Sequence, residues 1–139
     1  MIVLDTNVIS VFMKPEADAQ VASWLDTQPR ESLWTTAVTV FEIRQGLEIL
    51  ALSRRRQSLE DAFARALDEA FVGRVLPFDE SAAQAAGRIG AARRKVGRPV
   101  EVRDLQIAGI AIARKAAIAT RNIRHFESLG IELINPWTV

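Results

Sequence analysis

The 139-residue chain contains no cysteine and only one histidine, His125. Without cysteine it can form neither disulfide bonds nor thiolate metal sites, a composition that suits the reducing cytoplasm in which we expect the protein to work. One histidine is too few for a histidine-based zinc site, and it argues against a Ser-His-Asp triad. These absences remove several common kinds of enzyme site before any motif is considered.

Long apolar segments and a dominant charge are also missing. The longest uninterrupted apolar run, Ile107 to Ala113, has seven residues and is far too short to span a membrane. No basic segment precedes the first apolar stretch, so we expect no secretion signal. The net charge is +1, from 18 basic and 17 acidic residues, and says nothing about binding to nucleic acid. The length fits one domain, residues 1–139.

Short apolar runs alternate with segments of helical periodicity along the chain. This alternation predicts an α/β fold, in which a short parallel β-sheet is sandwiched between α-helices. Sites in such sheets lie outside the carboxyl ends of the strands, which is where Asp5 and Asn122 stand. We expect strands near residues 2–4, 33–36, 74–78, 117–120 and 131–134, and helices near 8–13, 17–27, 39–50, 59–71, 79–94 and 104–115.

Three acids stand in apolar surroundings, unlike most acids of the chain. Asp5 follows a run of three apolar residues, Glu42 lies between two apolar residues, and Asp104 stands on the most apolar helical segment. A parallel α/β fold would bring all three to one edge of the sheet. The sequence therefore marks them as candidates for a common site.

Each of these acids also has a purely structural explanation. Asp5 could cap the first helix through its side chain. Thr39 and Glu42 fit a capping box, in which the Glu42 side chain reaches back to the Thr39 amide. Asp104 could be the N-cap of its own helix. For each acid taken alone, the sequence leaves both interpretations open.

Convergence of the three acids would demand a cation. Three carboxylates close together repel one another and take up protons unless positive charge neutralises them. In a chain without thiolates and with one histidine, the oxygen ligands favour Mg²⁺ or Mn²⁺. An ion held in this way lowers the pKa of bound water and stabilises the charge that develops in phosphodiester hydrolysis, for which a spare carboxylate can act as the base.

Several segments of the chain, in this order and at these separations, resemble the motifs of PIN-domain ribonucleases. The resemblance is closest to the VapC- or FitB-like toxins of type II toxin–antitoxin systems, and it covers nearly the whole chain. One short match would be weak, whereas the combination is a strong signal. The segments are Leu4–Val8, Thr39–Gly46, Arg103–Ala108 and Thr120–Phe126, the last followed by Asn135–Trp137.

The resemblance implies a PIN fold and a metal-dependent endoribonuclease. It makes Asp5, Glu42 and Asp104 the catalytic acidic cluster, with Asp5 and Asp104 as direct ligands of Mg²⁺ or Mn²⁺ and Glu42 acting mainly through metal-bound water. Thr6 would hydrogen-bond and orient the Asp5 carboxylate. Many family members carry a fourth acid where this chain has Asn122, which leaves open whether one or two ions bind.

The resemblance also implies partners: an RNA substrate and a small antitoxin that covers the acidic groove, often with an arginine. Homodimers or toxin–antitoxin hetero-oligomers are expected, with no membrane association. A basic cluster before the Asp104 segment either steers RNA toward the groove or forms a solvated helix end. This cluster consists of Arg93, Arg94, Lys95 and Arg98.

Three other functions are weighed against this one. A phosphatase or phosphotransferase with an aspartyl nucleophile usually needs a second acid two residues after the first, where this chain has Asn7. A Rossmann nucleotide-binding domain needs a glycine-rich turn after the first strand, and residues 6 to 15 contain no glycine. A catalytically silent PIN module that binds RNA or protein is disfavoured by the presence of all three acids.

Overall fold

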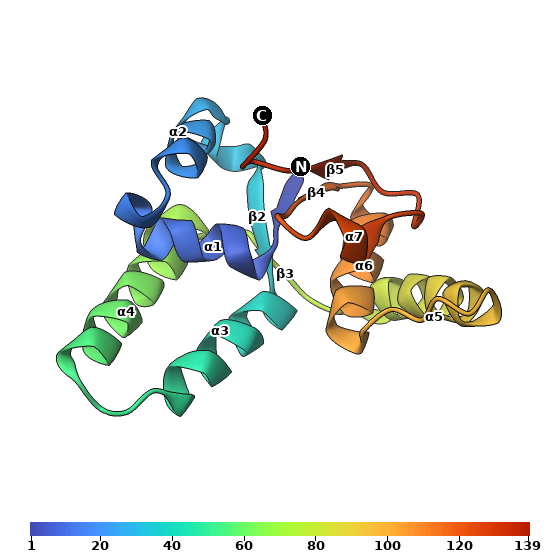
Figure 1. Cartoon of the computed structure of the whole chain (residues 1–139), viewed down its shortest axis with the longest axis horizontal. Coiled ribbons are helices and arrows are strands. Elements are labelled where there is room, and N and C mark those ends of the chain that lie inside the picture. Colours follow the sequence, from blue (N-terminus) through green and yellow to red (C-terminus); the bar gives the residue numbers. More distant parts are fainter.

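The computed structural model describes residues 1–139, which form a five-stranded sheet between two groups of helices (Figure 1). The strands are β1 Ile2–Leu4, β2 Leu33–Thr36, β3 Val75–Leu76, β4 Ala117–Ala119 and β5 Leu133–Ile134. The α-helices are α1 Thr6–Met13, α2 Ala19–Thr27, α3 Ala37–Ile49, α4 Arg54–Arg65, α5 Glu80–Lys95, α6 Val102–Arg114 and α7 Ile123–Phe126. Shorter turns are the 3-10 turns η1 Pro15–Ala17 and η2 Arg30–Ser32 and the π-helical turn η3 Ala66–Ala70.

The sheet has the strand order β3-β2-β1-β4-β5, and all its neighbouring strands are parallel. The predicted α/β sandwich is therefore confirmed. Leu4, the last residue of β1, is paired in register with Ala119, the last residue of β4. The next residue along each strand, Asp5 and Thr120, consequently emerges at the same edge of the sheet, which the carboxyl ends of parallel strands share.

The helices bury both faces of the sheet because successive strand residues point to opposite sides. Leu4 and Ala119 belong to a core shared with α1, α2, α3 and α4, whereas Val3 and Ile118 belong to a second core shared with α5, α6 and α7. The near-continuous apolar character of β1 and β4 follows from burial on both sides. None of the helices combines the length and apolar character that crossing a membrane requires.

Element boundaries differ from the predicted ones in several places; β5, for example, spans only Leu133–Ile134 instead of residues 131–134, and α7 was not predicted. The segment 17–27 divides into η1 and α2, because the side chain of Asp18 accepts a hydrogen bond from the Val21 amide and starts a new helix. The segment 59–71 begins earlier, as α4, and ends in the π-helical turn η3. Strand β3 spans only Val75–Leu76 instead of residues 74–78.

Helix α6 lies directly against α5 at Gly109 (Figure 1). A Cβ atom at this position would come within 2.4 Å of the Ala82 carbonyl oxygen and 2.8 Å of the Ala86 Cβ. Gly109→Ala should therefore lower the free energy of unfolding by about 1–3 kcal/mol, because the α5 backbone would have to move away. Urea denaturation followed by circular dichroism measures this loss.

Gly87 on α5 provides the matched control, because a Cβ there would meet no atom within 4 Å. Gly87→Ala should raise stability by about 0.5–1 kcal/mol, the ordinary gain from replacing glycine in a helix. Equal effects of the two alanine substitutions would contradict the close α5–α6 contact.

Candidate functional site

Asp5 is the buried centre of the candidate site. It directly follows β1, its amide donates to the Ala119 carbonyl oxygen at 2.9 Å, and the residue is only 6% exposed. One carboxylate oxygen accepts from the Thr6 amide at 2.8 Å, which makes Asp5 the N-cap of α1. The other accepts from the Thr120 hydroxyl at 2.8 Å and from the Asn7 side-chain amide at 3.4 Å. Capping therefore occupies only part of this carboxylate.

Glu42 lies on α3 and faces α1. Helix α3 is capped by Thr36, whose hydroxyl accepts from the Thr39 amide at 3.0 Å, so the interpretation of Thr39 and Glu42 as a capping box is wrong. The Glu42 carboxylate instead accepts from the Thr6 hydroxyl at 3.2 Å. Thr6 thus contacts Asp5 through its backbone amide, as an orienting residue should, and Glu42 through its side chain.

Asp104 lies in the first turn of α6 but does not cap it. The N-cap is Glu101, whose carboxylate accepts from the amides of Arg103 at 2.9 Å and Asp104 at 3.3 Å. The interpretation of Asp104 as an N-cap is therefore wrong. Its side chain instead contacts Nδ1 of His125 at 3.0 Å and is left available to the site.

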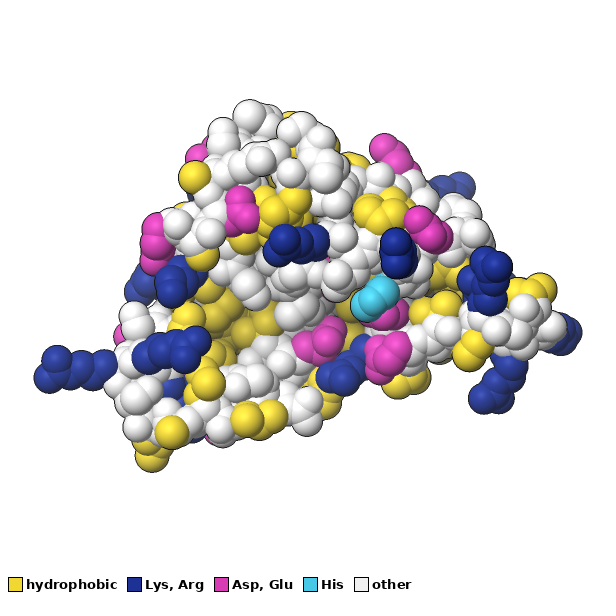
Figure 2. Space-filling model, in the orientation of Figure 1, with side chains coloured by type: hydrophobic (Ala, Val, Ile, Leu, Met, Phe, Trp, Pro, Cys, Tyr) yellow, Lys and Arg dark blue, Asp and Glu magenta, His cyan; other side chains and the backbone are white.

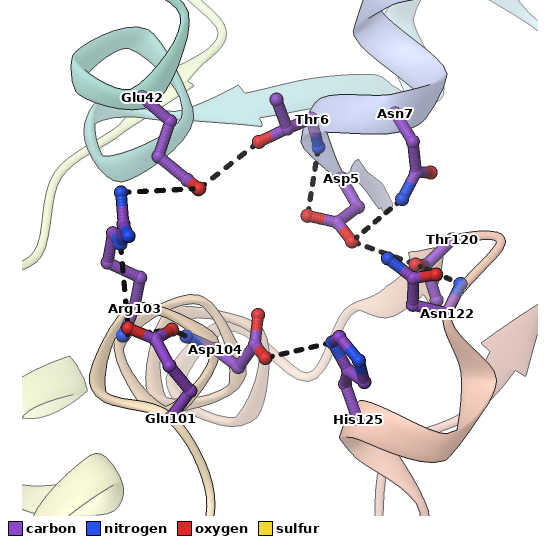
Figure 3. Close-up of polar contacts among 10 residues, drawn as sticks. All are labelled: Asp5, Thr6, Asn7, Glu42, Glu101, Arg103, Asp104, Thr120, Asn122 and His125. Atoms are coloured by element: carbon purple, nitrogen blue, oxygen red, sulfur yellow. Dashed lines mark hydrogen bonds and ion pairs between the residues drawn. The ribbon is translucent and has the colours of Figure 1, made fainter. Parts of the chain in front are cut away.

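The three acids come from distant parts of the sequence and point toward a common centre (Figure 3). Burial, opposed by the nearby His125 and reinforced by the negative charges of Asp5, Glu101 and Glu42, raises the pKa of Asp104 from 3.8 to about 6. Burial and the charge of Asp5 also raise the pKa of Glu42, against the Thr6 hydrogen bond and Arg103. A bound cation would relieve both the cost of burying these carboxylates and their mutual repulsion.

The donor set suits a hydrated divalent ion. No group of three or more His, Cys, Asp or Glu side chains lies close enough to enclose a metal without rearrangement. Mg²⁺ does not need such a cage, because it keeps several waters and is commonly held by one or two carboxylates. Oxygen ligands without any thiolate also fit Mn²⁺. Asp5 and Asp104, facing each other from β1 and α6, are the residues that would hold it.

The other predicted site residues do not all lie beside the acidic cluster. The exposed Asn122 reaches the site through its backbone amide, which donates to the Thr120 hydroxyl at 2.9 Å, and its side chain makes no hydrogen bond. Arg93 and Arg98 line a pocket that also includes Asp104, whereas Arg94 lines a different pocket between α5 and α6. Lys95 lies exposed at the end of α5, outside both.

Two site residues were not singled out from the sequence. Thr120 is fully buried, donates to Asp5 and accepts from Asn122, so it holds the acid in place. The sequence could have indicated Thr120, because it directly follows the apolar residues of β4 as Asp5 follows those of β1. Arg103 lies 3.9 Å from Glu42 and 3.5 Å from Glu101, and it links α3 to α6 across the site. Only the packing of α3 against α6 brings Arg103 to Glu42.

Pockets of opposite character lie on the two sides of the acids. An apolar groove of about 400 Å³ between α1 and α3 includes Thr6 and Glu42 in its lining. The pocket of about 240 Å³ beside Asp104 and His125 is lined mainly by charged side chains. Figure 2 shows the histidine and nearby acids at the centre of this face, with exposed apolar side chains on one side and basic side chains over α5 on the other.

Known proteins are similar to this chain in both sequence and fold. The PIN domain profile matches residues 2–131. VapC ribonuclease Y4jK from Sinorhizobium fredii is 39% identical over 137 residues, which cover 99% of this chain and 98% of that protein. Toxin FitB from Neisseria gonorrhoeae is 33% identical over 137 residues, 99% of each chain. The crystal structure of FitAcB from Neisseria gonorrhoeae superposes with a TM-score of 0.91 at 32% identity, over 100% of both chains.

These matches span nearly the full length of the chain, and they agree with the parallel sheet described above. The resemblance of the sequence to VapC- and FitB-like proteins is thereby confirmed. The chain belongs to the PIN-domain family.

Proposed function

We propose that this chain is the endoribonuclease toxin of a toxin–antitoxin pair and hydrolyses RNA phosphodiester bonds with Mg²⁺ or Mn²⁺. The observation that carries the proposal is the arrangement of Asp5, Glu42 and Asp104 around one centre, with the pKa of Glu42 and Asp104 raised. The names of relatives support it, since they include a VapC ribonuclease and the tRNA(fMet)-specific endonuclease VapC of Shigella flexneri.

Each acid has a distinct role in this proposal. A divalent ion bound there supplies a more acidic water and neutralises charge on the phosphate. Asp5, oriented by three hydrogen-bond donors, and Asp104 hold the ion. Glu42, oriented by the Thr6 hydroxyl, would accept a proton from the attacking water, a role that its raised pKa favours. Asn122 offers no fourth carboxylate, so the proposal needs only one ion.

The antitoxin belongs on the apolar groove between α1 and α3. The groove is lined by Val11, Ile43, Leu47 and Leu59, and the nearby Ile49 is 78% exposed. An apolar antitoxin segment placed there would end beside Glu42, where a basic side chain could neutralise the acids. Solved structures of relatives pair FitA with FitB and VapB with VapC. In this proposal the bound state is a toxin–antitoxin hetero-oligomer.

Metal removal tests the activity directly. The purified chain should cleave single-stranded RNA in Mg²⁺ or Mn²⁺, lose cleavage in EDTA, and recover it when either ion is added back, because the acids alone supply no activated water. Gel analysis of a labelled RNA measures the cleavage. RNA binding with no metal-dependent cleavage would instead support a catalytically silent PIN module.

Thr120 should act as a positioning residue. Thr120→Val keeps the shape but removes the hydroxyl that contacts Asp5 and the Asn122 amide. Cleavage should fall about 10–100-fold, as for other residues that orient metal ligands, and the free energy of unfolding should fall by about 1–3 kcal/mol. Thr120→Ser restores the hydroxyl and should recover most of the kcat. Failure of serine to do so would limit Thr120 to a packing role.

A further inference from the structure

The charged pocket beside Asp104 differs from the acidic site in what lines it. Three arginines converge on it from separate segments: Arg93 from the end of α5, Arg98 from the loop between α5 and α6, and Arg124 from α7. The pocket also includes His125 and the acids Glu101 and Asp104. Its position next to Asp104 makes it continuous with the candidate site.

The arginines of this pocket have no counterions within the chain. None of the three forms an ion pair or a side-chain hydrogen bond. Other arginines of the chain do pair with acids: Arg44, Arg56, Arg103 and Arg114. The Nε of Arg93 is buried and lacks any hydrogen-bond partner. A buried polar group without a partner is costly, and a ligand that accepts its hydrogen bond relieves that cost.

The two acids of the pocket are already engaged elsewhere. The Glu101 carboxylate accepts hydrogen bonds from two amides at the start of α6. The Asp104 carboxylate contacts His125 and points toward the centre that it shares with Asp5 (Figure 3). The guanidinium groups therefore remain free to bind an anion from outside the chain.

We propose that Arg93, Arg98 and Arg124 form a subsite for an RNA backbone phosphate next to the one that is cleaved. The inference rests on the proposed ribonuclease function and adds to it where the substrate strand runs: past Asp104, between α7 and the end of α5. Guanidinium groups suit this role because they donate parallel hydrogen bonds to phosphate oxygens. Single-stranded RNA supplies phosphates at regular intervals, so a strand at the acids also presents one to this pocket.

The subsite gives different roles to adjacent residues of the basic cluster. Arg94 follows Arg93 directly but lines the neighbouring pocket between α5 and α6, and Lys95 is exposed at the end of the helix. Removal of either charge changes the overall charge of the chain as much as removal of Arg98 does. These two neighbours are therefore matched controls for long-range electrostatic attraction.

The test is direct binding of a fluorescein-labelled single-stranded RNA in EDTA, so that no cleavage occurs, over a series of salt concentrations. Arg98→Ala and Arg124→Ala should each weaken binding about 10-fold, the loss expected for one charge-assisted hydrogen bond. Each should also reduce the slope of log Kd against log salt by about 0.7. Arg94→Ala and Lys95→Ala should bind nearly as the unmodified chain does.

Each contrary result has a separate meaning. Equal losses in the pocket variants and the controls would overturn the subsite in favour of diffuse attraction, and unchanged binding in all four variants would overturn it outright. Pocket variants that bind RNA normally but lose affinity for the antitoxin would assign the pocket to an acidic protein segment instead. Absence of RNA binding by the unmodified chain would contradict the proposed function as well. Thermal melts of Arg98→Ala and Arg124→Ala establish that both fold.

Discussion

Asp5→Asn should abolish metal-dependent RNA cleavage, with a loss of more than about 10³-fold, while leaving the fold intact. The amide removes the negative charge that would hold the ion, and activation of water depends on that ion. Asparagine caps helices as well as aspartate does, so the start of α1 should survive. The single amide oxygen keeps the hydrogen bond from the Thr6 amide, and the Thr120 hydroxyl can turn to accept a hydrogen bond from the new NH₂ group. Single-turnover cleavage in Mg²⁺, together with urea denaturation, measures both effects.

Asp79→Asn is the matched control for this substitution. Asp79 is also an acidic N-cap, since it accepts from the Ala82 amide at 3.0 Å at the start of α5, but it lies outside the site. Its substitution should leave cleavage unchanged. Full cleavage by Asp5→Asn would remove Asp5 from the mechanism, and unfolding of that variant would show that α1 depends on the charge itself.

Asp104→Asn should produce two opposite effects, a loss of cleavage and a gain in stability without metal. Cleavage should fall by about 10²-fold or more, since a charged ligand is lost. The folded protein holds the Asp104 proton up to a pH of about 6, whereas the unfolded chain releases it near 3.8. Stability that depends on the protonated form is therefore present below pH 4 and is lost as the pH rises through 6.

Above pH 6 the ionised Asp104 thus destabilises the metal-free protein. The raised pKa corresponds to at most about 3 kcal/mol, which solvent screening at this partly exposed side chain reduces to about 1 kcal/mol. Asp104→Asn should consequently raise the Tm by roughly 4 °C at pH 7.5 and leave it nearly unchanged at pH 4. Thermal melts in EDTA at the two pH values measure the difference.

The contact between Asp104 and His125 provides the internal check. If that contact stabilised the protein more than repulsion from the other acids destabilises it, Asp104→Asn would lower the Tm at pH 7.5, and the repulsive acid cluster would be refuted. Addition of Mg²⁺ should raise the Tm of the unmodified protein by mass action and raise that of Asp104→Asn less.

Sequence reasoning identified the strands well because their patterns are local. Strands β1 and β2 have the predicted bounds: β1 is an apolar run ended by Asp5, and β2 is a short run of residues with high strand propensity. The caps of α3 and α6 were less predictable. Thr36 and Thr39 are equally acceptable caps for α3, and for α6 the usual cap preference favours Asp104 over Glu101, which is the observed cap. Because Thr36 and Glu101 cap these helices, the side chains of Glu42 and Asp104 are free to face the site.

The remaining features depend on packing between segments distant in sequence. The Thr6 hydroxyl reaches Glu42 only because α1 lies against α3, and Arg103 lies near Glu42 only because α6 packs beside α3. Likewise, the orientation of α5 about its own axis, set by its packing on α6, places Arg93 and Arg94 in different pockets. Such contacts leave no periodic signal in the chain, whereas strand-end acids do.

The central position of β1, between β2 and β4, has a consequence for synthesis of the protein. Asp5 is translated long before its partners Ala119 and Thr120, which lie more than a hundred residues further along the chain. A nascent chain still short of β4 has neither the neighbouring strand nor the hydroxyl that orient this acid. If the proposed nuclease activity holds, the acidic site therefore stays unassembled during synthesis until β4 has been made.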